Sequence, residues 1–238
     1  MPFSSSHTPA TRLLLVRHAA TTMIEEGRFS GDTGVELSET GREQAARLAE
    51  RLEPLEIDAV YSSPLSRARD TAHILAAPHR LEVVENPELR EISSGHWVGL
   101  TRAEVEERHR AEYETWQTDP FLLAPVGGET GVAVLARAMP VIRQIVVAHE
   151  GRTALVVSHK ATLRLILSSL LGFDLRNWRD RLDQAPACLN VVDFLDPVRA
   201  RLMLFNDTSH YSVQPREAKA SLSKWWDRHE ESARSGAS

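Results

Sequence analysis

The stretch LLLVRHAATT, residues 13–22, runs from four apolar residues directly into Arg17 and His18. A short run of Leu and Val without polar alternation is typical of a strand covered on both faces, as in a parallel sheet. In open α/β sheets, ligands bind at the carboxyl ends of such strands. The stretch therefore predicts a buried strand with a functional position at its end. The alternative is that Arg17 and His18 only begin a solvated loop.

The composition is that of an ordinary globular protein. The chain has 238 residues, of which 42% are hydrophobic and 26% charged, enough for one sizeable α/β domain or two small ones. A net charge of −5 gives no general attraction to nucleic acid or to an anionic membrane, so we expect neither as a partner, and any anion site must be a local basic cluster. The single Cys188 excludes an internal disulfide and fits a reducing compartment. We find no secretory signal pattern and no apolar run long enough to span a bilayer, and therefore expect a cytoplasmic protein.

Strand and helix patterns alternate along the chain. The strand patterns lie at 13–17 and within DAVYSSP, HRLEVVENP and TALVVSH. The helical patterns lie at LSETGREQAARLAERL, where Thr40 and Glu43 are predicted to form a capping box, at LSRARDTAHILAA, 101–114, 131–149 and ATLRLILSSLLG. This alternation predicts an α/β fold whose central sheet is mostly parallel and is flanked by helices on both faces. Late strands near 189–195 and 200–206 are predicted to form a hairpin, which adds an antiparallel edge strand.

The chain is predicted to divide into three parts. Residues 1–11 are rich in Ser, Thr and Pro and are predicted to be disordered, whereas residues 12–211 form one domain. Residues 212–238 are predicted to form a helical tail that contains Trp225 and Trp226. We expect this tail to pack on its own subunit, with a homodimer contact or a lid over the site as the alternatives.

Two of the predicted strands each end in a histidine, His18 after Arg17 and His159 after Ser158. If these strands are neighbours in the sheet, both imidazoles converge on one crevice. The segment SPLSRARDT adds Arg67 at the start of a helix, where free N–H groups and the helix dipole favour anions. Guanidinium groups bind phosphoryl oxygens bidentately, and nearby cations disfavour the charged form of a histidine. The cluster predicts a phosphate site with a neutral, nucleophilic histidine.

Four segments, LVRHA, SPLSRARDT, LREISSGHWVGL and VVSH, stand in the order and rough spacing of the histidine phosphatase superfamily. The chain resembles the phosphoglycerate mutase-like branch of that superfamily over residues 12–211, including LSETGREQA, GGET and NDTSHY. The resemblance implies a phosphoglycerate mutase-like fold. It also implies a phosphatase that hydrolyses a small phosphorylated metabolite through a phosphohistidine, without a metal ion or other cofactor. No convincing metal-ligand spacing occurs in the sequence.

The resemblance assigns roles to residues at the strand ends. His18 would be the nucleophile that takes the phosphoryl group. Arg17 and Arg67 would bind the phosphate oxygens, and His159 would be a further donor to them. Fixed cationic groups of this kind supply the charge neutralisation and alignment that in-line phosphoryl transfer needs.

The resemblance also implies two roles in loops. Glu91, in LREISSG, would be the general acid for the leaving oxygen and then the base for water. Separately from the resemblance, we hypothesise that this carboxyl is buried near the indole of Trp97. Glu88 and Glu85 are the alternatives for this role. Ser30, in GRFSG, matches a hydroxyl position that touches phosphate in some members of the family.

The sequence departs from the family pattern at three positions. Ala19 stands where a Gly usually follows the nucleophile, and we expect it to crowd the backbone. Ile24 replaces a common Asn, which removes one polar contact. Lys160 follows the second histidine, where the family usually has a small residue or Gly; it would contact an anionic substrate or lie exposed on the first turn of a helix.

Two other functions are compatible with these motifs. The resemblance implies that true mutases carry a longer, basic insertion between Glu91 and His159, whereas TWQTDPFLLAPVGGET is apolar and poor in Lys and Arg. The phosphatase interpretation is therefore favoured over phosphoglycerate mutase-type phosphoryl transfer. The second alternative is a non-catalytic phosphate-binding module on the same fold, because fold does not imply function.

Overall fold

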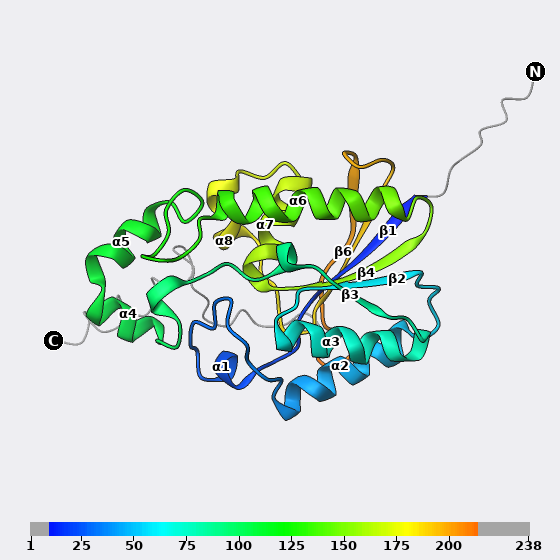
Figure 1. The fold of residues 1–238 in the computed structure, drawn as a ribbon, viewed down its shortest axis with the longest axis horizontal. Coiled ribbons are helices and arrows are strands. Elements are labelled where there is room, and N and C mark those ends of the chain that lie inside the picture. Colours follow the sequence, from blue (N-terminus) through cyan, green and yellow to red (C-terminus); the bar gives the residue numbers. More distant parts are fainter. Residues whose placement is uncertain (1–9, 214–238) are drawn as a thin grey trace, which may run out of the picture.

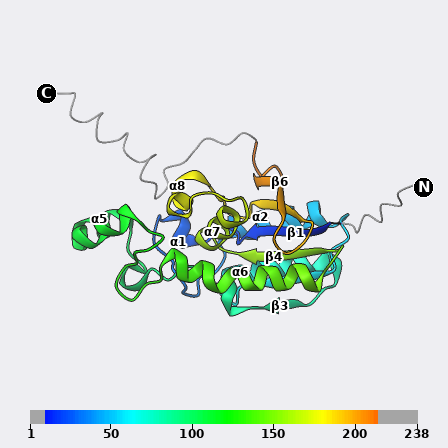
Figure 2. The ribbon, with the colours of Figure 1, turned by 90° about the horizontal axis from the view of Figure 1, so that it is seen from above.

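The computed structural model describes residues 10–213 and contains one six-stranded sheet between two layers of helices (Figures 1 and 2). The sheet order is β3-β2-β4-β1-β5-β6. The strands are β1 Thr11–Arg17, β2 Ala59–Ser62, β3 Val83–Glu85, β4 Thr153–Ser158, β5 Leu189–Phe194 and β6 Ala200–Asp207. Residues 1–9 and 214–238, which include most of the predicted tail with Trp225 and Trp226, lie outside the described residues. The prediction of disorder over residues 1–11 is wrong at Thr11, which is buried and begins β1.

The opening stretch forms the central strand. β1 pairs in parallel with β4, with Leu14 opposite Leu155, and antiparallel with β5, with Leu14 opposite Val191. β2 pairs in parallel with both β4 and β3, and β5 pairs antiparallel with β6. The predicted mostly parallel sheet with an antiparallel strand pair at one edge is therefore confirmed.

The helices within the described residues follow the predicted alternation. The α-helices are α1 Thr22–Glu25, α2 Glu39–Leu52, α3 Ser66–Ala76, α4 Arg102–Arg108, α5 Arg110–Thr118, α6 Gly131–Ala148, α7 Lys160–Leu170 and α8 Trp178–Arg181. Short 3₁₀ segments lie at Ala77–His79, Pro87–Leu89, Gly95–Trp97 and Leu175–Asn177. Helices α4 and α5 extend beyond the carboxyl ends of the parallel strands, at the left of Figure 1.

The two faces of the sheet explain why the strand at 13–17 has no polar alternation. Leu13 and Leu15 pack with α6 and α7, whereas Leu14 and Val16 pack with α2 and α3. Figure 1 shows these two helix pairs on opposite sides of the sheet. Because both faces are covered, every side chain of the run is buried, and burial of a Leu or Val side chain contributes roughly 1.5–3 kcal/mol to stability.

Helix α2 does not begin where the sequence predicts. Ser38, not Thr40, is the N-cap, and its hydroxyl accepts the N–H of Gly41 at 3.1 Å. The start of the helix packs against the chain just after β1, because a Cβ at Gly41 would lie 2.0 Å from the carbonyl oxygen of Ala20. This close approach fixes the first turn, so the capping box predicted at Thr40 is wrong.

The predicted helix at 101–114 is divided at His109, whose backbone (φ −133°, ψ 33°) is not helical. Its first half, α4, does begin with a capping box, formed by Thr101 and Glu104. Its second half, α5, continues to Thr118. The break turns α5 so that Tyr113 and Trp116 join an aromatic cluster with Trp97.

Among the described residues, α6 alone is long and apolar enough to cross a membrane by length and composition. Its apolar side chains have another explanation in this fold. Ala138, Ile142 and Ile145 are buried against the sheet in the same cluster as Leu13. The hydropathy of α6 is thus that of a core helix.

Candidate active site

Two buried histidines lie side by side at the carboxyl ends of the central strands. His18 follows β1 and His159 follows β4, and these strands are parallel neighbours with Arg17 opposite Ser158. The two imidazole centroids are 5.1 Å apart, and His18 and His159 are 2% and 0% exposed. The sheet register therefore brings both motif histidines to one point.

The hydrogen bonding of His18 assigns its tautomer. Its Nδ1 lies 2.8 Å from the carbonyl oxygen of Ala19, and a carbonyl only accepts, so Nδ1 carries the proton and donates. Nε2 then holds a lone pair. Burial, followed by the charges of Arg67 and Arg17, lowers the pKa of His18 well below 6.5. At pH 7 the ring is neutral, and Nε2 is free to act as a nucleophile.

Two buried arginines flank the histidines and are oriented by backbone carbonyls. Arg17 Nη1 donates to Gln184 O at 2.7 Å. Arg67 donates from Nη1 to Thr33 O at 2.5 Å and from Nη2 to Gly31 O at 2.6 Å. Burial lowers both pKa values, that of Arg67 to about 10, so both groups stay charged at pH 7. Carbonyl partners orient a cation without cancelling its charge, which leaves that charge available to an anion.

His159 is held by a residue that the sequence analysis did not single out. Its Nε2 lies 2.7 Å from the Oγ of Ser63, which directly follows β2. Ser63 is the first residue of the SPLSRARDT motif, in which only Arg67 was predicted to have a role. Burial, followed by the charge of Arg67, lowers the pKa of His159 well below 6.5. Within residues 10–213, three nitrogens of this cluster, Arg17 Nε, Arg67 Nε and His159 Nδ1, are buried without a hydrogen-bond partner. Such a donor set matches the oxygens of a phosphoryl group.

Of the three candidate carboxylates, Glu91 is the one that reaches the strand ends. Its Oε1 and Oε2 accept the N–H groups of Thr162 and Ala161, both at 3.3 Å, at the start of α7. Its charge acts on both Arg17 and Arg67. Glu88 instead points to Arg90 at 3.7 Å, and Glu85 is exposed on β3.

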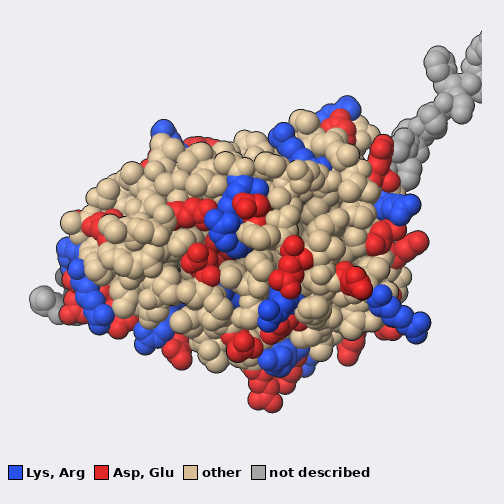
Figure 3. All heavy atoms as spheres, viewed as in Figure 1, with Lys and Arg blue, Asp and Glu red and all other residues tan. Residues whose placement is uncertain are grey.

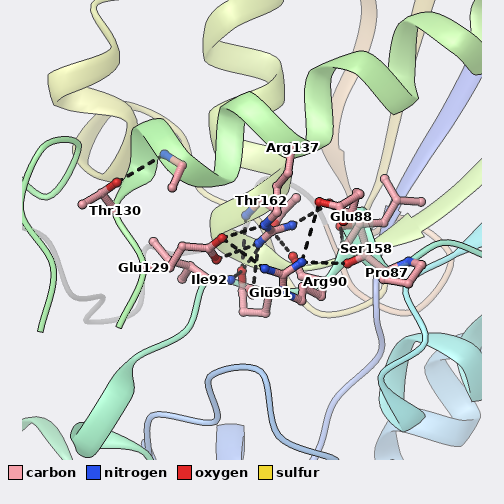
Figure 4. A network of polar contacts seen from close by, with 12 residues as sticks. Pro87, Glu88, Arg90, Glu91, Ile92, Glu129, Thr130, Arg137, Ser158 and Thr162 are labelled. Atoms are coloured by element: carbon pink, nitrogen blue, oxygen red, sulfur yellow. Dashed lines mark hydrogen bonds and ion pairs between the residues drawn. The ribbon is translucent and has the colours of Figure 1, made fainter. Parts of the chain in front are cut away.

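A buried ion pair holds the loop that carries Glu91 (Figure 4). Arg137, on α6, donates to the carbonyl oxygens of Glu88 at 2.5 Å and Glu91 at 3.2 Å. The same guanidinium binds both carboxylate oxygens of Glu129, at 2.8 and 2.9 Å, and Arg90 contacts that carboxylate at 3.4 Å. This ion pair could not be predicted from the sequence, where the GGET segment that contains Glu129 is its one signal.

The loop with Ser30 is at the site, but its hydroxyl makes no recorded contact there. Ser30 directly precedes Gly31, whose carbonyl orients Arg67, and its own carbonyl accepts the Thr33 hydroxyl at 2.7 Å. Trp97 packs in the aromatic cluster with Tyr113 and Trp116. The Glu91 carboxylate accepts the N–H of Ile92 at 3.0 Å, in addition to its contacts with α7.

The crowding expected at Ala19 does not occur. Among the described non-glycine residues only Arg80, Ala187 and Asn206 have positive φ, so Ala19 has an ordinary backbone conformation. Its side chain is buried, and its N–H donates to Thr71 Oγ1 at 3.1 Å. Replacement of Gly at this position therefore costs no backbone strain.

The other two departures lie at helix starts. Ile24 is half-buried in α1, behind the N-cap Thr21. Lys160 begins α7 directly after His159, and its ammonium lies 3.4 Å from Asp183. Ile24 thus follows the strand that carries His18, and Lys160 directly follows His159.

In the part of the chain that the structure describes, one group has metal-ligand chemistry. His96, His109 and Glu112 place three ligand atoms within 4.8 Å of one another. His96 Nε2 and Glu112 Oε2 are 2.7 Å apart, and this hydrogen bond accounts for their proximity without an ion. The residues belong to the segment around α4 and α5, not to the strand ends.

The positive charge of the site is a local feature. On the face drawn in Figure 3, basic and acidic side chains are interspersed, without a continuous basic surface. This agrees with a net charge of −5 and with the expectation that an anion site must be a local cluster.

Comparisons with known proteins agree with this geometry. A family model described as histidine phosphatase superfamily (branch 1) matches residues 13–208. Phosphoserine phosphatase 1 of Hydrogenobacter thermophilus is 35% identical over 175 residues, covering 73% of this chain and 83% of that protein. Glucosyl-3-phosphoglycerate phosphatase of Mycobacterium tuberculosis is 33% identical over 177 residues, covering 71% of this chain and 79% of that protein.

A solved structure shows the same fold. YhfR of Bacillus stearothermophilus has a TM-score of 0.79 and 31% sequence identity, covering 84% of this chain and 99% of that one. A longer relative, named as a bifunctional protein of Mycobacterium tuberculosis, is 37% identical over 204 residues, and the chain spans 55% of its length.

Proposed function

This chain belongs to the histidine phosphatase superfamily and is a phosphoric monoester hydrolase, and we propose that it hydrolyses small phosphorylated metabolites through a phosphohistidine at His18, without a metal ion. The observation that carries the proposal is the neutral, buried His18, whose Nε2 is left free by the Nδ1 hydrogen bond. Two charged guanidinium groups, Arg17 and Arg67, lie beside it and supply the positive charge that a metal ion supplies in other phosphatases.

In the first step, His18 Nε2 attacks phosphorus in line with the leaving oxygen. The N–P bond forms as the P–O bond breaks, and Arg17, Arg67 and His159 bind the three equatorial oxygens. Glu91 gives its proton to the leaving oxygen, so the product is a neutral alcohol. The rigid strand ends hold these groups in place, which reduces the reorganisation needed in the transition state.

In the second step, water attacks the phosphohistidine. Glu91, now ionised, takes a proton from the water, the N–P bond breaks, and inorganic phosphate leaves with His18 restored. The N–H groups of Ala161 and Thr162 bind the Glu91 carboxyl oxygens at the start of α7 and hold them in one position for both proton transfers.

We further propose that the protein works in the cytoplasm. Cys188 is the only cysteine of the chain, and its buried thiol lies 3.1 Å from Gln184 Oε1. Burial raises its pKa to about 11, so the thiol stays protonated and unreactive at pH 7. A chain without disulfides is typical of a reducing compartment.

A panel of phosphomonoesters assayed for phosphate release, with and without EDTA, tests this proposal. We expect hydrolysis that the chelator leaves unchanged, and an acid-labile, base-stable phosphoryl group on the protein after rapid quench. Loss of activity in EDTA would contradict the metal-independent mechanism. Transfer of the phosphoryl group to a second substrate hydroxyl, without phosphate release, would indicate a mutase, and phosphate binding without turnover would indicate a non-catalytic module.

Replacing Arg137 with Gln is expected to lower kcat by about tenfold to 10²-fold and to change KM little. Arg137 forms no hydrogen bond with Arg17, Arg67 or His159, the proposed phosphate-binding residues. It holds the backbone carbonyl of Glu91, so its loss displaces the Glu91 carboxyl group without weakening substrate binding. Steady-state kinetics on an alkyl phosphate measure both constants. The matched control is Arg143→Gln, an exposed arginine on the same helix, which should retain wild-type constants.

A double variant shows whether Arg137 acts by positioning Glu91 or whether its replacement disturbs the structure more widely. If Arg137 acts through Glu91, then adding Arg137→Gln to Glu91→Gln should cost little further activity, because the two residues form one unit. Fully additive losses, or a rise in KM with kcat unchanged, would show that Arg137 does not position the acid.

A further inference from the structure

Two cations on one face of α7 share a single carboxylate. Lys160 Nζ lies 3.4 Å and Arg164 Nη2 lies 3.1 Å from Asp183 Oδ1. The two residues are one helical turn apart, so their side chains are neighbours on the helix surface. The Arg164 side chain is 5% exposed, whereas those of Lys160 and Asp183 are 30% and 50% exposed. Lys160 and Asp183 thus form the open end of the group, and Arg164 forms its buried end.

This group borders the phosphate-binding residues. Lys160 directly follows His159, and Asp183 directly precedes Gln184, whose carbonyl orients Arg17. The charge of Arg17 acts on both Lys160 and Arg164. An anion bound between Arg17 and His159 therefore has the Lys160 ammonium as a close neighbour.

The positive charge of the group exceeds what its carboxylate compensates. Asp183 supplies one negative charge to Lys160 and Arg164, and Glu91 supplies a second that acts on Arg164 and Arg17. The three cations Lys160, Arg164 and Arg17 thus face two carboxylates. Within the described residues, Arg164 Nε is buried without a hydrogen-bond partner. Burial, followed by the charges of Arg164 and Arg17, lowers the pKa of Lys160 to about 7. A second anion at this position would relieve that repulsion.

The start of α7 is not itself the binding feature, because its first N–H groups are already used. Those of Ala161 and Thr162 donate to Glu91. The side chain of Lys160 is the feature that can bind a ligand here, since it begins the helix directly after His159. Its ammonium offers three donors on a flexible stem, so it can bind a second anion beside the half-exposed Asp183.

We propose that Lys160, backed by Arg164, binds a carboxylate on the leaving group, so that the enzyme prefers phosphomonoesters carrying a second negative charge. This inference rests on the proposed phosphatase function. The single, partly exposed Lys160 ammonium matches one carboxylate group. Phosphoserine, named in the relative from Hydrogenobacter thermophilus, is a phosphomonoester of this class.

The matched substrates O-phosphoserine and O-phosphoethanolamine test the proposal, because they differ only by the carboxylate. We expect wild type to favour phosphoserine in kcat/KM. Lys160→Gln should reduce the ratio of the two kcat/KM values by about 10- to 100-fold, the range expected for losing a hydrogen bond to a charged group. Lys160→Arg should keep the preference, and Asp183→Asn should increase it, because a competing carboxylate is removed.

Arg201→Gln, which removes one exposed charge on β6, is the control and should leave the ratio unchanged. Equal kcat/KM values for both substrates in wild type, or an unchanged ratio in Lys160→Gln, would overturn the subsite. Calorimetric Kd values for the same two compounds give a second readout that needs no turnover. If no phosphomonoester is hydrolysed, the phosphatase proposal fails, while the subsite is still judged by whether Lys160→Gln abolishes the difference in Kd.

Discussion

Replacement of His18 by alanine is expected to lower kcat by about 10⁴-fold or more, because the enzyme loses the atom that forms the covalent intermediate. Nε2 is the only ring nitrogen of His18 with a free lone pair, since Nδ1 donates to Ala19 O. The neighbouring His159 does not replace it. Ser63 Oγ accepts the N–H of Leu65 and gives its own proton to His159 Nε2, so the ring proton of His159 lies on Nδ1 and neither nitrogen has a free lone pair. Rapid-quench assays should show no phosphoryl group on the variant, and steady-state assays should show no hydrolysis above background.

The binding of inorganic phosphate separates a lost nucleophile from a collapsed site. Arg17 and Arg67 are oriented by backbone carbonyls and not by His18, so His18→Ala should bind phosphate within a few-fold of wild type. His73→Ala, an exposed histidine on α3, is the control and should keep full activity. If His18→Ala still forms an acid-labile phosphoenzyme, the nucleophile lies elsewhere.

The sheet and the cluster at its centre could be predicted because both are encoded in short contiguous runs. β1 and β4 are each an apolar run that ends in a histidine, and parallel neighbours bring such ends to the same edge of a sheet. The helix start that carries Arg67 follows β2, the other parallel neighbour of β4. Local patterns and one topological rule are thus enough to bring the three motifs together.

The contacts around Glu91 could not be predicted, because they depend on backbone atoms. Arg137 holds the carbonyl oxygens of Glu88 and Glu91, and every residue carries such an acceptor, so no residue type marks the contact. The same limit applies to the cap of α2. Ser38 and Thr40 are both good N-cap residues, and the close packing of Gly41 on the chain after β1 selects Ser38.

The ion pairs of Lys160 and Arg164 with Asp183 could not be predicted for a different reason. The sequence showed that a cation follows His159, and it left open whether the side chain is exposed or meets an anion. Asp183 comes to Lys160 from a loop between α8 and β5, and no local pattern places that loop beside α7. Only the tertiary fold shows that Lys160 and Arg164 share one carboxylate next to Arg17.

Replacement of Glu91 by Gln is expected to have an effect that depends on the leaving group. An alkoxide leaves poorly without a proton, so kcat for an alkyl phosphate should fall by about 10²- to 10⁴-fold, the usual contribution of general acid catalysis. p-Nitrophenolate leaves without a proton, so formation of the phosphohistidine from p-nitrophenyl phosphate should be nearly unchanged. Hydrolysis of the phosphohistidine should then be slow, because Gln accepts no proton from the attacking water. Gln is nearly isosteric and keeps one of the two acceptor oxygens for the N–H groups of α7, while Arg137 still holds the loop through the backbone carbonyl of residue 91.

The two roles of Glu91 then separate in one stopped-flow trace. Glu91→Gln should release a burst of p-nitrophenol equal to the enzyme concentration, followed by slow turnover, and the phosphoenzyme should accumulate. The burst should vanish when His18→Ala is added, because it reports the N–P bond. Glu88→Gln, which removes the neighbouring carboxylate of the same loop, should show neither burst nor loss of rate. Equal losses for alkyl and nitrophenyl phosphates would exclude Glu91 as the acid. Slow turnover without phosphoenzyme would exclude it as the base, because the second step would then not be the one that Glu91 assists.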